Sequence, residues 1–257
     1  MEPKIVLRGD GGWRWYRGLV AVITAVTPDQ VEAALRQVET AVNTRHLHAA
    51  GFLTYEASAA YGLATRPRPD GELPLLWFGL FAEIVQIDEI AELRLDNASP
   101  TQSPIANLQS PAWQPALNET QYAQAIAAIK AQIAAGNTYQ VNFTFPLTAP
   151  FAGDAWPFFQ ALAAAQPSAY AAYLDIGSHV ICSASPELFF QLDGERIWSR
   201  PMKGTAVRGL TRSQDDASAQ ALAASEKNRA ENVMIVDMIR NDLGRVARTG
   251  SVAVPEL

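Results

Sequence analysis

A lysine at the end of a strand-like segment is the side chain best placed for chemistry in this sequence. Lys203 lies in residues 200–205 (RPMKGT), directly before Gly204 and Thr205. A glycine turn after a strand can present a lysine amine to a ligand. In a partly desolvated pocket such an amine loses its proton more readily and becomes a nucleophile. The alternative is an ordinary loop lysine in water.

Two glutamates are candidates for work beside that lysine. Glu187 follows Ser-Pro at the start of a predicted strand and is a candidate general acid, with a solvated strand end as the alternative. Glu231 lies on a final helix that is apolar nearly all round, so the helix is expected to be buried. Buried charges need partners or a metal, which predicts an Asp237–Arg240 pair and makes Glu231 a candidate metal ligand.

The predicted elements of the second half lead to these residues. Strands are expected over 170–175, 179–183 and 188–192, and Asp193-Gly194 predicts a hairpin that returns the chain to Lys203. A helix over 214–247, broken near Ser225, follows.

Two further elements are expected earlier in this half. Asn118 with Gln121 predicts a capped helix that ends at Gly136. Residues 139–147 alternate in polarity and predict a strand whose polar face, including Gln140, either lines a ligand cavity or faces water.

The first part of the chain mixes short strands and helices. Strands are expected near 19–26, 51–56 and 75–85, and a helix over 28–42 begins after Thr27. Residues 96–115 are rich in Ser, Pro, Asn and Gln and predict a linker. The expected organisation is therefore an N-terminal region with linker, 1–115, and a second region, 116–257.

Composition limits the class of protein. The chain has 257 residues, 49% apolar and 18% charged, with a net charge of −6, which favours a folded core and argues against nucleic-acid binding. An anionic small-molecule substrate would need a local positive pocket or a divalent metal. We expect a cytoplasmic protein, because no signal peptide or membrane span is evident and Cys182, as a single cysteine, cannot form an internal disulfide.

The order of several motifs resembles one enzyme family. Residues 185–187, 200–205 and 228–246, together with 139–142 and 51–56, are similar to segments of the chorismate-utilising enzymes. This family includes the first components of anthranilate synthase and aminodeoxychorismate synthase, isochorismate synthase and salicylate synthase. The resemblance implies an α+β fold with two packed antiparallel sheets surrounded by helices. A lysine before Gly-Thr is typical of the aminodeoxychorismate synthase branch, whereas anthranilate synthases typically carry alanine.

The resemblance also implies a reaction, in the folate (p-aminobenzoate) pathway. Glu187 would protonate the C4 hydroxyl of chorismate while Lys203 attacks C2, and ammonia would then add at C4 and expel the lysine. Ammonia would come from a glutamine amidotransferase subunit or domain.

Other residues carry implied roles. Gly204 and Thr205 would contact the substrate, and Glu231 would bind Mg²⁺ beside a substrate carboxylate. Gln140 stands where water-adding relatives carry a lysine base; glutamine cannot activate water, which favours ammonia as the nucleophile.

The sequence ends at Leu257, whereas the relatives it resembles continue with a second metal-binding glutamate, a substrate-binding arginine and further strands and helices. We therefore expect a fragment or a natural truncation with little or no synthase activity of its own. The alternatives are anthranilate synthase component I and a non-catalytic remnant that acts as an interaction module.

Overall fold

A computed structural model describes residues 2–9, 11–66, 71–93, 95 and 112–255. The chain divides into two compact units, one formed by residues 1–89 and 166–257 and the other by residues 90–165. Most of the predicted linker, residues 96–111, lies outside the described residues. The boundary after residue 115 stays a prediction.

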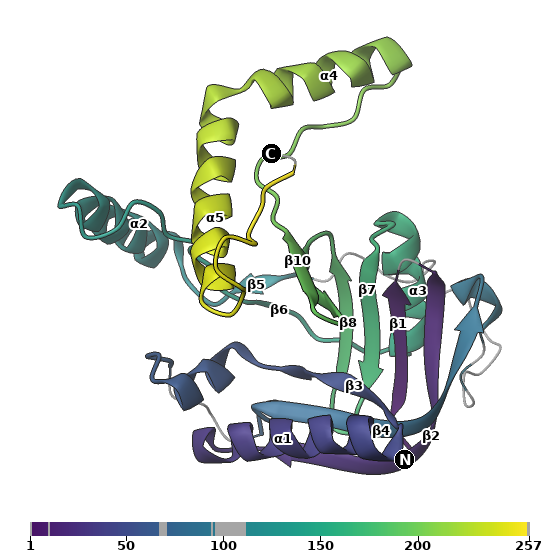
Figure 1. The fold of residues 1–257 in the computed structure, drawn as a ribbon. Coiled ribbons are helices and arrows are strands. Elements are labelled where there is room, and N and C mark those ends of the chain that lie inside the picture. Colours follow the sequence, from purple (N-terminus) through teal and green to yellow (C-terminus); the bar gives the residue numbers. More distant parts are fainter. Residues whose placement is uncertain (1, 10, 67–70, 94, 96–111, 256–257) are drawn as a thin grey trace. The chain divides into compact units, whose positions relative to one another are not determined.

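Helices and antiparallel sheets confirm the α+β class. The largest sheet of the described residues lies wholly in the first unit and has the order β3-β4-β2-β1-β7-β8, with every pair antiparallel (Figure 1). Its strands are β1 (Lys4–Gly9), β2 (Gly12–Ala25), β3 (His48–Leu53), β4 (Leu76–Ile87), β7 (Tyr170–Asp175) and β8 (Val180–Ser185). Strand β1 pairs with both β2 and β7, so it joins the early and late parts of the chain.

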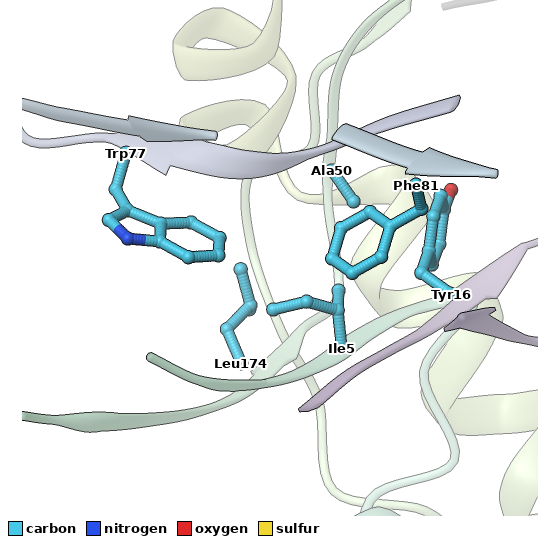
Figure 2. Packing of buried hydrophobic residues seen from close by; sticks show 6 residues of the cluster. All are labelled: Ile5, Tyr16, Ala50, Trp77, Phe81 and Leu174. Carbon is cyan, nitrogen blue, oxygen red and sulfur yellow. The ribbon is translucent and has the colours of Figure 1, made fainter. Parts of the chain in front are cut away.

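One face of this sheet carries the main apolar cluster (Figure 2). Phe81 and Ile5 have no exposed surface, and the ring of Tyr16 meets that of Phe81 edge-on with centroids 5.6 Å apart. The cluster consists of Ile5, Tyr16, Ala50, Trp77, Phe81 and Leu174. These residues come from β1, β2, β3, β4 and β7, so the curled sheet encloses a core of its own, as expected from burial of apolar area.

Helix α1 (Pro28–Arg45) packs against strands β2 and β4. Val31 contributes to an apolar cluster with Ala25 and Leu76, and Val38 to another with Leu80. The predicted start after Thr27 is confirmed, since Pro28 is the first helical residue. Two short 3₁₀ helices follow in the chain, η1 (Tyr55–Tyr61) and η2 (Ile90–Glu92).

The second unit contains α2 (Glu119–Ala134), α3 (Ala155–Ala165) and the short strands β5 (Gln114–Pro115) and β6 (Leu147–Thr148). The predicted cap is confirmed. The backbone N–H of Asn118 donates to the Gln121 side chain at 2.9 Å, and that of Gln121 donates to the Asn118 side chain at 2.9 Å. Gly136, at φ +75°, stands just past the helix end, as predicted.

The predicted strand over residues 139–147 is wrong. Only Leu147 of this segment is in a strand, where it pairs with Pro115. The alternating aromatic side chains pack locally instead: Phe143 and Phe145 each lie 6.0 Å from the ring of Tyr122 on α2, measured between centroids. This contact with a helix accounts for the apolar face without a neighbouring strand.

The last elements follow the expected order. They are the hairpin strands β9 (Leu188–Asp193) and β10 (Arg196–Arg200), then α4 (Arg212–Ala224) and α5 (Glu226–Gly244). Ser225 separates the two helices, as predicted, and its hydroxyl accepts a hydrogen bond from the Asn228 backbone N–H at 3.4 Å.

Helix α5 differs from expectation in its surroundings. None of its residues is buried, and Met238 is 48% exposed, so the prediction of a buried helix is wrong. The Asp237–Arg240 ion pair is confirmed at 2.8 Å, but both side chains are exposed. No helix in the described part of the chain is long and apolar enough to cross a bilayer.

Candidate active site

The candidate nucleophile lies in a segment without helix or strand, between β10 and α4. Lys203 is half-buried in this segment, residues 201–211, and follows the last residue of β10 by three positions. The hairpin places the start of β9 beside the end of β10, since Arg200 is opposite Leu188. Residues just before β9 therefore meet residues just after β10.

This pairing brings Glu187 to the lysine segment. The Glu187 Oε1 atom accepts a hydrogen bond from the backbone N–H of Met202 at 3.1 Å. Met202 is the residue before Lys203, so the structure brings the candidate acid and the backbone that carries the candidate nucleophile together. The carboxylate keeps its Oε2 atom for a second role.

Serine hydroxyls hold the backbone at Glu187. The Ser185 hydroxyl donates to the Glu187 carbonyl at 3.2 Å and accepts from the Glu187 N–H at 3.4 Å. The Ser185 carbonyl in turn accepts a hydrogen bond from the hydroxyl of Ser168, which is only 6% exposed. A buried hydroxyl needs such partners, so this arrangement anchors the acid-bearing turn to the end of the large sheet.

The residue after the lysine requires glycine. Gly204 has φ +80°, and a Cβ built there would lie 2.9 Å from Cγ of Asn228 on α5. Both the backbone conformation and the close approach favour a residue without a side chain. Thr205 comes next and is exposed. The lysine segment thus passes directly against the first turn of α5.

Glu231 lies one turn further along the same helix. It is half-buried, and residues three apart on a helix are neighbours, so Glu231 is adjacent to Asn228 on the helix surface. Within the described ranges, no three His, Cys, Asp or Glu side chains are grouped so that they could hold a metal ion. A single carboxylate fits Mg²⁺ only where substrate oxygens and water supply the remaining ligands, a mode this ion commonly adopts.

The far end of the lysine segment is tied to α4. The Arg208 guanidinium binds the Asp215 carboxylate through two bonds, of 2.6 Å from Nε and 2.5 Å from Nη2, and the Gly209 N–H donates to the same carboxylate at 3.1 Å. The Arg208 hydrogen bond, helped by that of Gly209, lowers the pKa of Asp215 below its ordinary value. This contact was missed from the sequence.

Gln140 belongs to the second unit, residues 90–165. It is half-buried in an irregular segment, and its backbone carbonyl accepts a hydrogen bond from the Thr138 hydroxyl at 3.0 Å. Its proposed role toward the substrate stays a prediction.

Asn228 and the Met202 backbone were missed from the sequence as parts of this site. Asn228 stands inside the segment 228–246 that carries the resemblance. Because asparagine is common in the first turn of a helix, its position there gave no sign of a further role. Backbone donors such as the Met202 N–H have no signal in a sequence.

Comparison with known proteins identifies the type of fold and the family. The structure is similar to the crystal structure of anthranilate synthase component I from Streptococcus pneumoniae TIGR4, with a TM-score of 0.67, 19% identity, and coverage of 95% of this chain and 60% of that one. The fold is therefore of the anthranilate synthase component I type. The sequence model of the chorismate binding enzymes matches residues 2–257. This chain belongs to the chorismate-binding enzymes.

Individual relatives are more similar in sequence. The chain is 35% identical over 223 residues to aminodeoxychorismate synthase component 1 of Klebsiella aerogenes, covering 81% of this chain and 49% of the relative. It is 43% identical over 159 residues to the protein of the same name from Salmonella typhimurium, covering 62% of this chain and 35% of the relative. Anthranilate synthase component 1 of Thermus thermophilus is 40% identical over 135 residues, which cover 52% of this chain and 29% of that protein. The chain spans about half the length of these relatives or less.

Proposed function

We propose that this chain carries the nucleophile and acid of an aminodeoxychorismate synthase component I, which converts chorismate and ammonia to 4-amino-4-deoxychorismate. The observation that carries the proposal is the Glu187–Met202 hydrogen bond, which holds a carboxylate beside the segment of Lys203. An acid held beside the segment that carries an amine is what displacement of a hydroxyl by a lysine requires. The names of the Klebsiella and Salmonella relatives support the same choice.

Glu187 is the general acid in this proposal. Its Oε1 atom is engaged by the Met202 N–H, so Oε2 delivers the proton to the C4 hydroxyl of chorismate. A hydroxyl is a poor leaving group, and protonation allows it to depart as water. The backbone bond keeps the carboxyl group in one orientation while it does so.

Lys203 acts as the nucleophile in its neutral form. Its amine forms a bond to C2, the two conjugated ring double bonds both shift toward C4, and the C4–oxygen bond breaks. Ammonia then forms a bond to C4, both double bonds shift back, and the bond between C2 and the lysine nitrogen breaks with its electron pair returning to the amine. The surplus proton of the added ammonia passes to the Glu187 carboxylate. Two easier displacements thus replace one difficult one.

The remaining residues bind and orient. The Gly204 backbone and the Thr205 hydroxyl contact the substrate, and Gln140 favours ammonia over water. Glu231 would hold Mg²⁺ together with a substrate carboxylate, and the ion would offset the negative charge of the substrate in a chain of net charge −6. A glutamine amidotransferase subunit or domain supplies ammonia, in the folate (p-aminobenzoate) pathway. A cytoplasmic location accompanies this proposal, since the chain has one cysteine, Cys182.

The test uses residues 1–257 alone and as a chimera in which they replace the matching part of the Klebsiella aerogenes relative. With chorismate, Mg²⁺ and an ammonium salt, we expect aminodeoxychorismate from the chimera and little from the 257-residue protein alone. Lys203→Ala should abolish the product, whereas Lys227→Ala, which alters an exposed lysine on α5, should retain it. Product formation at full rate by Lys203→Ala would refute the role of Lys203.

A second candidate is anthranilate synthase component I, which the Thermus relative favours. The same chimera assay separates the two, because anthranilate is aromatic and fluorescent whereas aminodeoxychorismate is not. A third candidate is a non-catalytic interaction module. The observation in its favour is the exposed apolar surface of β9, where Phe189 is 84% exposed.

A further inference from the structure

The segment that carries Lys203 is fixed at three points. Near its start the Met202 N–H binds Glu187, near its middle Gly204 packs against Asn228, and near its end Asp215 holds Arg208 and Gly209. Lys203 stands between the first two of these points. The position of the Lys203 backbone, and with it the direction in which the side chain leaves the chain, therefore depends on both.

The contact at Gly204 is the closest approach of this segment to α5. A Cβ at residue 204 would lie 2.9 Å from Asn228 Cγ, 3.1 Å from its Oδ1 and 3.2 Å from its Cβ. The asparagine is the third residue of α5, and its own backbone N–H is bound by the Ser225 hydroxyl at 3.4 Å. Its side chain thus projects from a capped helix start, which is a rigid support for a segment without regular structure.

We propose that Asn228 is a positioning residue for Lys203. Its side chain supports the left-handed turn at Gly204, and together with the Glu187–Met202 bond it holds the residue between them in one orientation. The inference rests on the proposed function, in which Lys203 is the nucleophile. Small displacements of a nucleophile cost large factors in rate, so a support on each side of the lysine serves the reaction. In this role Asn228 acts through the backbone at Gly204 and not through the reacting atoms.

The test measures the reactivity of each lysine and needs no turnover. The 257-residue protein is acetylated briefly with an N-hydroxysuccinimide ester, and peptide mass spectrometry gives the labelling rate of Lys203 relative to Lys130, which is exposed in the second unit. In Asn228→Ala the Lys203 ratio should rise by about threefold or more, because the amine is no longer held. Arg229→Gln alters the next residue of the same turn and should leave the ratio within about twofold.

Two further variants separate positioning from folding. Asn228→Leu keeps a branched side chain with a Cγ atom and should return the ratio to within about twofold of the original protein. Gly204→Ala should lower the unfolding midpoint. Adding Asn228→Ala should recover part of that loss, because the Asn228 Cγ and Oδ1 atoms that crowd the new Cβ are then gone, and the effects of two residues in contact are not additive.

An unchanged Lys203 ratio in Asn228→Ala, or strictly additive midpoints, would overturn the proposal. Labelling rates that rise equally at every lysine would leave the ratio unchanged, would indicate general unfolding, and would overturn the proposal as well. Since labelling uses no chorismate, this outcome is independent of whether Lys203→Ala keeps the synthase product.

Discussion

The carboxylate of Glu187 and the backbone N–H of Met202 are joined by a 3.1 Å hydrogen bond across the open end of the β9–β10 hairpin. The bond links the turn that follows the large sheet to the residue before Lys203. A side chain assigned to proton transfer therefore also shapes the segment of the nucleophile. The two roles can be separated by substitution.

Replacement of Glu187 by glutamine and by alanine should give different stabilities. Glutamine keeps an oxygen that accepts the Met202 N–H, so its free energy of unfolding should stay within about 0.5 kcal/mol of the original value. The alanine variant should be less stable than the original protein by about 0.5–1.5 kcal/mol. Both should abolish acid catalysis. Urea unfolding provides the measurement, and equal losses in the two variants would show that the hydrogen bond adds no stability.

The strand β3 should not tolerate a side chain at Gly51. A Cβ there would overlap the Trp77 carbonyl oxygen and lie 2.7 Å from Phe78 Cα, and both neighbours are backbone. We expect Gly51→Ala to lower the free energy of unfolding by about 1–3 kcal/mol or more. Gly11→Ala is the control, because nothing lies within 4 Å of its Cβ position. A Gly51→Ala protein as stable as the control would contradict the close approach.

The apolar cluster predicts a contrast between two phenylalanines. Phe81 has no exposed surface, so Phe81→Ala should cost about 3–5 kcal/mol through lost burial and the cavity left behind. Phe189 is 84% exposed, and Phe189→Ala should change stability by about 0.5 kcal/mol or less. Chemical denaturation of both variants measures the difference, and a similar cost for both would contradict the placement of the core.

The tie between Arg208 and Asp215 predicts a pH effect of defined sign. The ordinary pKa of the carboxyl is 3.8 and the folded value is lower, so the unfolded chain binds this proton more tightly. The stabilisation is fully present above 3.8 and is lost as the pH falls through the lowered pKa. The difference in thermal midpoint between the original protein and Asp215→Asn should therefore shrink at acid pH.

Asp216→Asn serves as the control for that experiment, because Asp216 is the exposed neighbour on α4 and has no part in the Arg208 contact. If the difference in thermal midpoint between the original protein and Asp215→Asn grows as the pH falls, folding does not lower the pKa of Asp215.

Burial should slow the chemistry of Cys182. Desolvation raises the pKa of its thiol from 9.0 to about 11, as expected for a side chain half-buried in β8. The thiolate fraction near neutral pH should then be about 100-fold below that of the unfolded chain, and alkylation by iodoacetamide should slow accordingly. Rates measured in buffer and in urea test this. Equal rates would mean that the thiol is not shielded.

Local signals in the sequence predicted the ends of elements well. Thr27 before Pro28, Asn118 with Gln121, and Ser225 each mark a helix boundary that the structure has. Such signals work because the groups that satisfy the first helical N–H groups lie within a few residues. Asp193-Gly194 predicted its hairpin for a similar local reason.

Predictions that depended on distant partners were less successful. Alternation over residues 139–147 showed which side chains share a face, but the face packs on Tyr122 of a helix rather than joining a sheet. The apolar composition of α5 indicated a preference for burial, yet the described residues leave Met238 half-exposed. The polarity pattern of a segment shows which of its faces prefers to be buried. It does not show which part of the molecule covers that face.

The candidate site divides in the same way. The resemblance selected Glu187, Lys203 and Gly204, which the hairpin brings into one region. It gave no indication of the supports at Met202 and Asn228. Met202 acts through its backbone N–H, and Asn228 packs against the space that Gly204 leaves free because it has no side chain.

The central place of β1 has a consequence for synthesis on the ribosome. Residues 4–9 are made long before β7, which ends at Asp175, so one edge of β1 waits for its partner strand. Pairing over such a separation closes slowly and cannot begin until the late strand has left the exit tunnel. The nascent chain must therefore expose an unpaired strand edge until β7 has been made, a period in which a chaperone would limit aggregation.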